Sequence, residues 1–259
     1  MNTRLSLLSI SILFLTQSLL HADGIVPVSY SSTEGPNTFA LSSTAAAGRT
    51  YQMTILSNQL SSLVGQSLTG MQWRLNNAAT VNWPPANVTY SFFNIFVGPG
   101  VAPASMSNTF SSNFTSSPTQ VRSGGLTFFA NSFTAGATGT TPNAFGAVVN
   151  FSTPYLYTGG DLALEMRFSA QSGTTTLPSF DAVGTADPLW NNQISGRWTA
   201  DANGISGGNG NFLVTNFVTA AVPEPATLAM IGVGVVGLVT WHYRRRKNLA
   251  AANARKVKR

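Results

Sequence analysis

The sequence predicts an all-β fold, either a β-sandwich or a jelly roll, for the long central part of this 259-residue chain. Two observations predict it. Short segments in which apolar and polar residues alternate recur along the chain, and clusters of glycine, proline, asparagine and serine separate them about every dozen residues. Short strands at this spacing are typical of antiparallel sandwiches and barrels, so we expect about seven to nine strands around one hydrophobic core.

The alternation also assigns the side chains that face the core. In each of the best-defined strands every second residue is apolar, so one face turns inward and the other turns to solvent. The residues expected to face inward are Tyr51, Met53, Ile55, Met71, Trp73, Leu75, Phe93, Ile95, Val97, Leu162, Leu164, Met166 and Phe168. Further strands are expected within 124–133, 145–152, 195–200 and 211–220, and one short helix within 58–64.

Charge is concentrated at the carboxyl end of the chain. The formal net charge is +6, but eight of the 14 cations lie within residues 244–259. Residues 23–222 hold five arginines, seven acids and no lysine, which is a net charge of −2. Because phosphate binding needs cations clustered on one surface, we do not expect this part of the chain to bind nucleic acid.

The central part of the chain lacks the side chains on which most enzyme chemistry depends. The protein has no cysteine, and its two histidines, His21 and His242, lie outside residues 23–221. Without cysteine, histidine or lysine, a Ser-His-Asp triad, a Cys-His dyad, a histidine-ligated zinc site and a Schiff base are all excluded. We therefore expect no enzyme activity, no metal and no cofactor.

A pair of carboxylates is the catalytic device that remains. Asp161 and Glu165 stand on the same, solvent-facing side of the strand expected within 159–170, four residues and about 13 Å apart. That separation is too long for either geometry of glycoside hydrolysis. Arg167 is two residues from Glu165 on the same face and favours a surface ion pair instead. A carboxylate-dependent glycosidase is thus the least favoured function.

A glycine-rich segment near residue 204 begins like a calcium-binding loop. Asp201 and Asn203 supply oxygens, and Gly204 stands at a turn position. Phe212, however, occupies the twelfth place, where a calcium loop needs a bidentate glutamate. We therefore expect a glycine-rich hairpin in residues 201–212 and no metal.

Two tryptophans are candidates for ligand binding. Trp83 and Trp190 each lie close to a proline in a segment expected to be a loop, so we expect their indoles to be exposed. An exposed indole can stack on the C–H face of a sugar ring. A carbohydrate-binding module, or an ice-binding module with flat polar strands, is therefore the alternative function. Partial burial of both rings under a loop is the competing interpretation.

The amino-terminal segment has the three parts of a secretory signal peptide. Arg4 supplies the positive charge, residues 5–20 are mostly apolar, and Ala22 is the small residue before the expected cleavage site. The mature chain is then expected to begin at Asp23, outside the cytoplasm. A retained signal anchor is the alternative.

An apolar segment followed by arginines lies near the carboxyl end. Residues 226–241 carry no charge and would span about 24 Å as a helix, somewhat less than the hydrocarbon core of about 30 Å. His242 and Tyr243, placed in the interface, complete the span. By the positive-inside rule, the arginines at 244–246 stay in the cytoplasm and the body lies outside. We therefore expect one transmembrane helix here.

A Pro-Glu-Pro triplet precedes this apolar segment, and the whole order resembles the PEP-CTERM sorting signal. The residues that carry the resemblance are Pro223, Glu224, Pro225, Arg244, Arg245 and Arg246. The two prolines keep the triplet extended and outside the helix, at the membrane surface. The resemblance implies handling by an exosortase, a membrane-embedded cysteine transpeptidase, in bacteria that make extracellular polysaccharide. A proline-rich linker before an ordinary anchor is the alternative.

The sequence therefore predicts an exported bacterial surface or extracellular-matrix protein with a non-enzymatic structural or adhesive role. Its expected partners are an exosortase, the membrane and an exopolysaccharide or other glycan. The carboxyl-terminal helix is expected to anchor it in the envelope before sorting, with release into the matrix as a later fate. Four parts are expected: a signal peptide (1–22), a β-sandwich ectodomain (23–221), the sorting segment with its helix (222–247) and a basic cytoplasmic tail (248–259).

Overall fold

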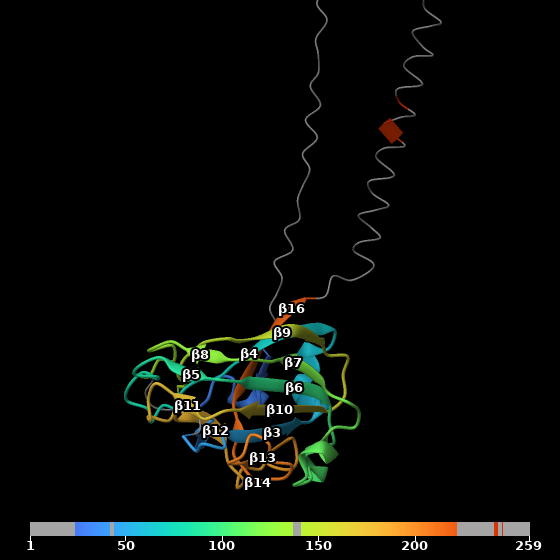
Figure 1. The fold of residues 1–259 in the computed structure, drawn as a ribbon. Helices are drawn as coiled ribbons and strands as arrows, with labels where there is room; N and C mark the ends of the chain where they lie inside the picture. Colours follow the sequence, from blue (N-terminus) through green and yellow to red (C-terminus); the bar gives the residue numbers. More distant parts are fainter. Residues whose placement is uncertain (1–23, 42–43, 137–140, 222–240, 243–244, 246–259) are drawn as a thin grey trace, which may run out of the picture.

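The computed structural model describes residues 24–41, 44–136, 141–221, 241–242 and 245. Residues 24–221 form a body built almost entirely of antiparallel strands (Figure 1), which confirms the predicted all-β fold. The expected signal peptide and the expected basic tail lie outside the described residues. So does the expected sorting segment, apart from residues 241, 242 and 245.

Sixteen strands and four short 3₁₀ helices make up the described part of the chain. The strands are β1 (Gly24–Val26), β2 (Asn37–Phe39), β3 (Arg49–Ile55), β4 (Gln66–Gln72), β5 (Val88–Tyr90), β6 (Phe93–Pro99), β7 (Thr119–Arg122), β8 (Leu126–Phe128), β9 (Val149–Leu156), β10 (Leu162–Phe168), β11 (Gln171–Ser172), β12 (Phe180–Val183), β13 (Ile194–Thr199), β14 (Gly208–Asn209), β15 (Phe212–Leu213) and β16 (Thr215–Ala221). The helices are η1 (Val28–Tyr30), η2 (Ser57–Leu63), η3 (Pro103–Ser105) and η4 (Phe110–Asn113). The number of strands is larger than the seven to nine expected, mainly because many of the observed strands are only two or three residues long.

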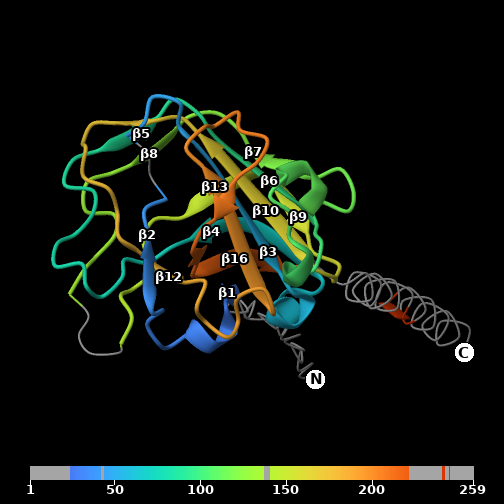
Figure 2. The same ribbon diagram turned by 90° about the horizontal axis from the view of Figure 1, so that it is seen from below.

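Two large sheets form the sandwich (Figure 2). One has six strands in the order β14-β13-β3-β10-β6-β7, and the other has four in the order β1-β16-β4-β9. Their inward side chains belong to one hydrophobic core, together with those of two three-stranded sheets, β11-β5-β8 and β15-β12-β2. All the residues that the alternation predicted to face inward are buried, each at 1% exposure or less. The local period of two therefore placed the core correctly.

The first and last strands of the body lie side by side. Gly24 pairs with Phe217 and Val26 with Thr215, so the start of β1 and the end of β16 lie at the same end of the four-stranded sheet (Figure 1). The backbone approach is close, because a Cβ atom on Gly24 would lie 2.6 Å from the carbonyl oxygen of Phe217. On its other side β16 pairs with β4, so Asn216 and Phe217 are paired on both edges, and the last residues of the strand pair with β4.

The outer face of the six-stranded sheet is covered, contrary to the expectation that it faces solvent. Thr50, Gln52 and Thr54 alternate with the core residues of β3 and yet are fully buried. The segment that carries η3 and η4 packs over Gln52, whose Nε2 atom donates to the carbonyl of Phe110 at 3.0 Å. Figure 2 shows this green segment beside β6 and β10. Thr50 Oγ1 donates to the carbonyl of Asp201 at 2.8 Å. The prediction that these polar residues of β3 face solvent is therefore wrong, because segments distant along the chain cover them.

Two local predictions hold. The short helix expected within 58–64 is η2, a 3₁₀ helix that buries Leu60 and Leu63. The glycine-rich segment is the hairpin between β13 and β14, which pair at Trp198 and Gly208. Asp201 Oδ1 accepts the N–H of Asn203 at 2.8 Å and so forms part of the turn.

Candidate functional site

The structure contradicts the prediction that Trp83 and Trp190 are exposed. Trp83 is 3% exposed and Trp190 is 7% exposed, and both belong to the hydrophobic core. The loop around Trp83 is drawn inward because its backbone exchanges hydrogen bonds with Phe133, at 3.0 and 2.9 Å. The Trp83 indole donates to the carbonyl of Thr176 at 2.9 Å. Neither ring presents an open face for a ligand to stack upon.

Trp83 does border a surface pocket of about 840 Å³. Val81 and Leu177, on its lining, are 71% and 41% exposed. Asn131, also on the lining, has a backbone φ of 60°. The lining contains no ionisable side chain, so this pocket offers apolar contacts and neutral polar groups only.

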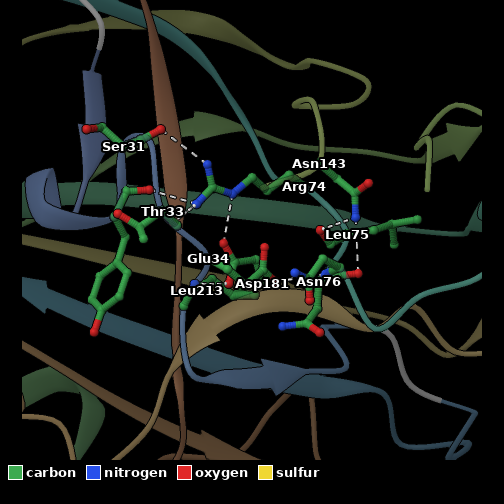
Figure 3. A network of polar contacts seen from close by, with 12 residues as sticks. Ser31, Thr33, Glu34, Arg74, Leu75, Asn76, Asn143, Asp181 and Leu213 are labelled. Atoms are coloured by element: carbon green, nitrogen blue, oxygen red, sulfur yellow. Dashed lines mark hydrogen bonds and ion pairs between the residues drawn. The ribbon is translucent and has the colours of Figure 1, made fainter. Parts of the chain in front are cut away.

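A buried ion pair joins the segment after β4 to strand β12 (Figure 3). Arg74 Nε lies 2.7 Å from Asp181 Oδ2, and the two side chains are 1% and 0% exposed. Asp181 Oδ1 also accepts the N–H of Gly35 at 2.8 Å. Burial raises the pKa of the Asp181 carboxyl, whereas the Arg74 guanidinium and the Gly35 amide act in the opposite direction. With both groups enclosed, the pair has no access to a substrate.

Arg74 uses its remaining donors to hold the amino-terminal segment. Its Nη2 atom donates to the carbonyl oxygens of Tyr30 and Thr33 at 2.7 and 2.8 Å. The guanidinium carbon also lies 5.2 Å from the centre of the Phe145 ring. In Figure 3 the guanidinium of Arg74 lies between Thr33 and Asp181. These contacts hold residues 28–35 against the core and stabilise the fold.

Glu34 lies beside this pair with one oxygen unsatisfied. Its Oε1 atom accepts the N–H of Asn77 at 2.8 Å, while Oε2 is buried and has no hydrogen-bond partner among the described residues. Burial raises the pKa of the Glu34 carboxyl above its ordinary value, and the nearby Asp181 adds to that effect. The ionised form of Glu34 is therefore disfavoured in the folded protein.

Glu34→Gln should make stability less dependent on pH. Because the pKa is higher in the folded state than in the unfolded state, the folded protein binds this proton more tightly and loses stability as the pH rises above about 4.5. Glutamine keeps an oxygen for Asn77 but does not ionise. Thermal unfolding followed by circular dichroism should show a shallower fall in melting temperature between about pH 4 and pH 7. Parallel curves for the two proteins would contradict the prediction.

Glu165 and Arg167 form the expected ion pair, but not on an open surface. Glu165 is only 5% exposed, since η4 and its neighbours cover this side of β10. Arg167 Nε lies 2.6 Å from Glu165 Oε1, and Gln52 Nε2 donates to Glu165 Oε2 at 3.0 Å. Gln52 Oε1 in turn accepts from Asn113 Nδ2 at 2.7 Å. No sequence pattern indicated this contact, because Asn113 lies 61 residues from Gln52 along the chain.

This ion pair lines a second pocket, of about 480 Å³. The rest of its lining is aromatic or small: Phe96, Ser111, Phe114, Ser116, Ser117 and Pro118. Asp161, the carboxylate considered as a catalytic partner of Glu165, lies outside this lining and accepts the N–H of Ser57 at 2.8 Å. Glu165 thus shares its pocket with an arginine and serines, and not with Asp161.

Neither a metal cluster nor a membrane span occurs within the described ranges. Among those residues, no group of three or more histidines, cysteines or acids could hold a metal ion. No helix there has the length and apolar character needed to cross a bilayer. The expected span at 226–241 lies almost wholly outside the described residues.

Of the predicted sorting residues, the described part of the chain includes Arg245. Its guanidinium carbon lies 5.3 Å from the centre of the exposed Trp241 ring. The remaining sorting residues lie outside the described residues: Pro223, Glu224, Pro225, Arg244 and Arg246.

The molecule is thus a β-sandwich body whose last strand runs directly into a carboxyl-terminal segment of distinct composition. A family model described as the PEP-CTERM protein-sorting motif matches residues 221–246 of that segment. The match confirms the resemblance seen in the sequence, and the motif implies an exported protein that an exosortase processes and sorts to the cell surface. No curated protein matches this chain.

Proposed function

We propose that this protein is a non-enzymatic component of the bacterial surface or extracellular matrix, with a structural or adhesive role. The observation that carries the proposal is the position of the sorting motif. It begins at Ala221, which is also the last residue of β16. Processing at the Pro-Glu-Pro triplet would therefore leave every strand of the body in place, ready for display.

The arrangement of the strands suits attachment at one end. Strand β16 lies between β1 and β4; β1 pairs with residues 215–217, and the pairing with β4 continues to Ala221 at the end of the strand. A pull on the carboxyl end would act on the pairing of residues 218–221 with β4 before it reached the residues that also pair with β1. A displayed or adhesive protein needs resistance to such a pull, because its attachment point carries the mechanical load.

The chemistry of the body supports a role without catalysis. Residues 23–221 contain no histidine, cysteine or lysine. Among the acids, Asp181 is closed in with Arg74, and Glu165 accepts bonds from Arg167 and Gln52. These carboxylates act as acceptors in the fold, and an acid-base pair for hydrolysis would need two that face one substrate.

Glu224→Ala should leave export intact and block processing of the tail. Secretion depends on the amino-terminal segment, whereas Glu224 is the charged residue of the triplet that the exosortase is expected to read. In a host that makes exosortase, the variant should accumulate as an unprocessed membrane species. Mass spectrometry of the carboxyl terminus measures this directly, with Lys258→Ala, outside the matched motif, as the control.

Two outcomes would count against the proposal. An intact Arg259 on most mature wild-type molecules would show that the segment is a permanent anchor. Equal processing of Glu224→Ala and wild type would show that the triplet is not what the processing enzyme reads.

A further inference from the structure

We propose that the pocket beside Arg167 and Glu165 binds a neutral sugar residue of a glycan. The proposal rests on the proposed function only in that a displayed body meets extracellular glycans. The site itself is argued from the pocket, which none of the sequence patterns indicated.

Arg167 has hydrogen-bond donors at the pocket that no other described residue uses. Its Nε atom is committed to Glu165 Oε1 at 2.6 Å. Its two terminal nitrogens bond to no acceptor in the described part of the chain, and the side chain is 30% exposed on the pocket lining. A guanidinium carries four N–H bonds on those two nitrogens. These donors are thus available to a ligand and lie in one plane.

The ion pair is held in a fixed position before any ligand arrives. Glu165 is bonded to Gln52, and Gln52 to Asn113, at 3.0 and 2.7 Å. Gln52 and Asn113 are both fully buried, so their side chains have little freedom to move. A ligand that binds to this arrangement would lose little affinity to the ordering of protein side chains.

The charges of the pair favour a neutral ligand over an anion. Glu165 offsets the charge of Arg167, and its carboxylate would repel a ligand carboxylate or phosphate that approached the guanidinium. A sugar hydroxyl both donates and accepts, so it can use an arginine donor and a carboxylate acceptor side by side. Arg167 and Glu165 are the two charged residues on the lining.

The rest of the pocket has the groups that a sugar ring needs. Phe96 and Phe114, both partly buried, offer apolar surface for the C–H face of the ring. Exposed serines at 111, 116 and 117 add hydroxyl groups. The volume of about 480 Å³ lies within the usual range for small-ligand sites.

The pocket is also well placed for a displayed protein. Ser111 belongs to η4, within the covering segment drawn in green. In Figure 1 that segment lies at the end of the body opposite to the end of β16, from which the sorting segment leaves. Attachment through β16 would leave the pocket free to meet a glycan.

The test uses the mature exported protein and an array of neutral glucans, galactans and mannans beside uronic-acid polymers. We expect binding to at least one neutral glycan, with its affinity then measured by isothermal titration calorimetry. Arg167→Met keeps the apolar stem and removes the donors, and should weaken that binding by a factor of ten or more. Arg122→Met, on β7 and outside the pocket lining, is the matched control and should bind as wild type does.

A second variant keeps the test independent of stability. Ser117 is exposed at the pocket, so Ser117→Trp should fold normally while its indole blocks the opening. It should weaken binding at least as much as Arg167→Met does. The proposal is overturned if wild type binds no neutral glycan, if it binds uronic-acid polymers alone, or if both variants bind unchanged. Processing of the tail, measured separately, tests the proposed function whichever of these results is found.

Discussion

Arg74→Met should lower the free energy of unfolding by about 3–5 kcal/mol, the usual cost of breaking a buried ion pair by removing one partner. The substitution leaves the Asp181 carboxylate, which is 0% exposed, without its 2.7 Å partner. It also removes the hydrogen bonds that Arg74 Nη2 donates to the carbonyl oxygens of Tyr30 and Thr33. For a domain of this size the melting temperature should fall by roughly 6–20 °C.

Denaturant unfolding of the mature protein measures this loss. Arg122→Met is the control: Arg122 bonds only to backbone carbonyls at the surface among the described residues, so its replacement should cost about 1 kcal/mol or less. The double variant Arg74→Met/Asp181→Leu removes both charges and should recover part of the stability lost in the single variant. A loss of less than about 1 kcal/mol for Arg74→Met would show that the pair does not fasten the amino-terminal segment.

Trp83→Ala should destabilise the fold by about 3–5 kcal/mol, as truncation of a buried tryptophan usually does. The Trp83 ring lies 5.5 to 5.7 Å, centre to centre, from those of Phe128, Phe133 and Phe180. Removing the indole would leave a cavity among these rings and free the Thr176 carbonyl. Thermal or denaturant unfolding of the variant gives the measurement.

Phe129→Ala is the matched control for this experiment. Phe129 is an aromatic residue next to Phe128, but it is 67% exposed, so its removal should change stability by no more than about 0.5 kcal/mol. Full stability of Trp83→Ala would contradict the prediction.

Much of the fold could be predicted from the sequence because strand burial follows a local rule. Successive side chains of a strand point to opposite faces, so Met53 and Leu164 could be assigned to the core from their neighbours alone. The same rule failed on the other face. It assigned Glu165 to solvent, because nothing within β10 indicates that η4, some fifty residues earlier in the chain, covers it.

The candidate glycan site could not be predicted for the same reason. Its charged pair comes from β10, the supporting amides from β3 and η4, and the serines from the covering segment. Each residue is unremarkable within its own stretch of sequence. Gln52 alternates with apolar residues in β3 as a solvent-facing residue would, so its burial and its need for partners follow only from the assembled structure.

The sequence by itself determined the sorting motif and the class of fold. The motif is a linear signal that another protein reads, so the order of its residues is sufficient, and the strand period depends only on backbone geometry. The tertiary structure alone decided that Trp83 is a core residue, that Arg74 and Asp181 meet, and that Arg167 borders a pocket. These outcomes depend on contacts between segments distant along the chain, where burial and hydrogen bonding are settled by what packs against each side chain.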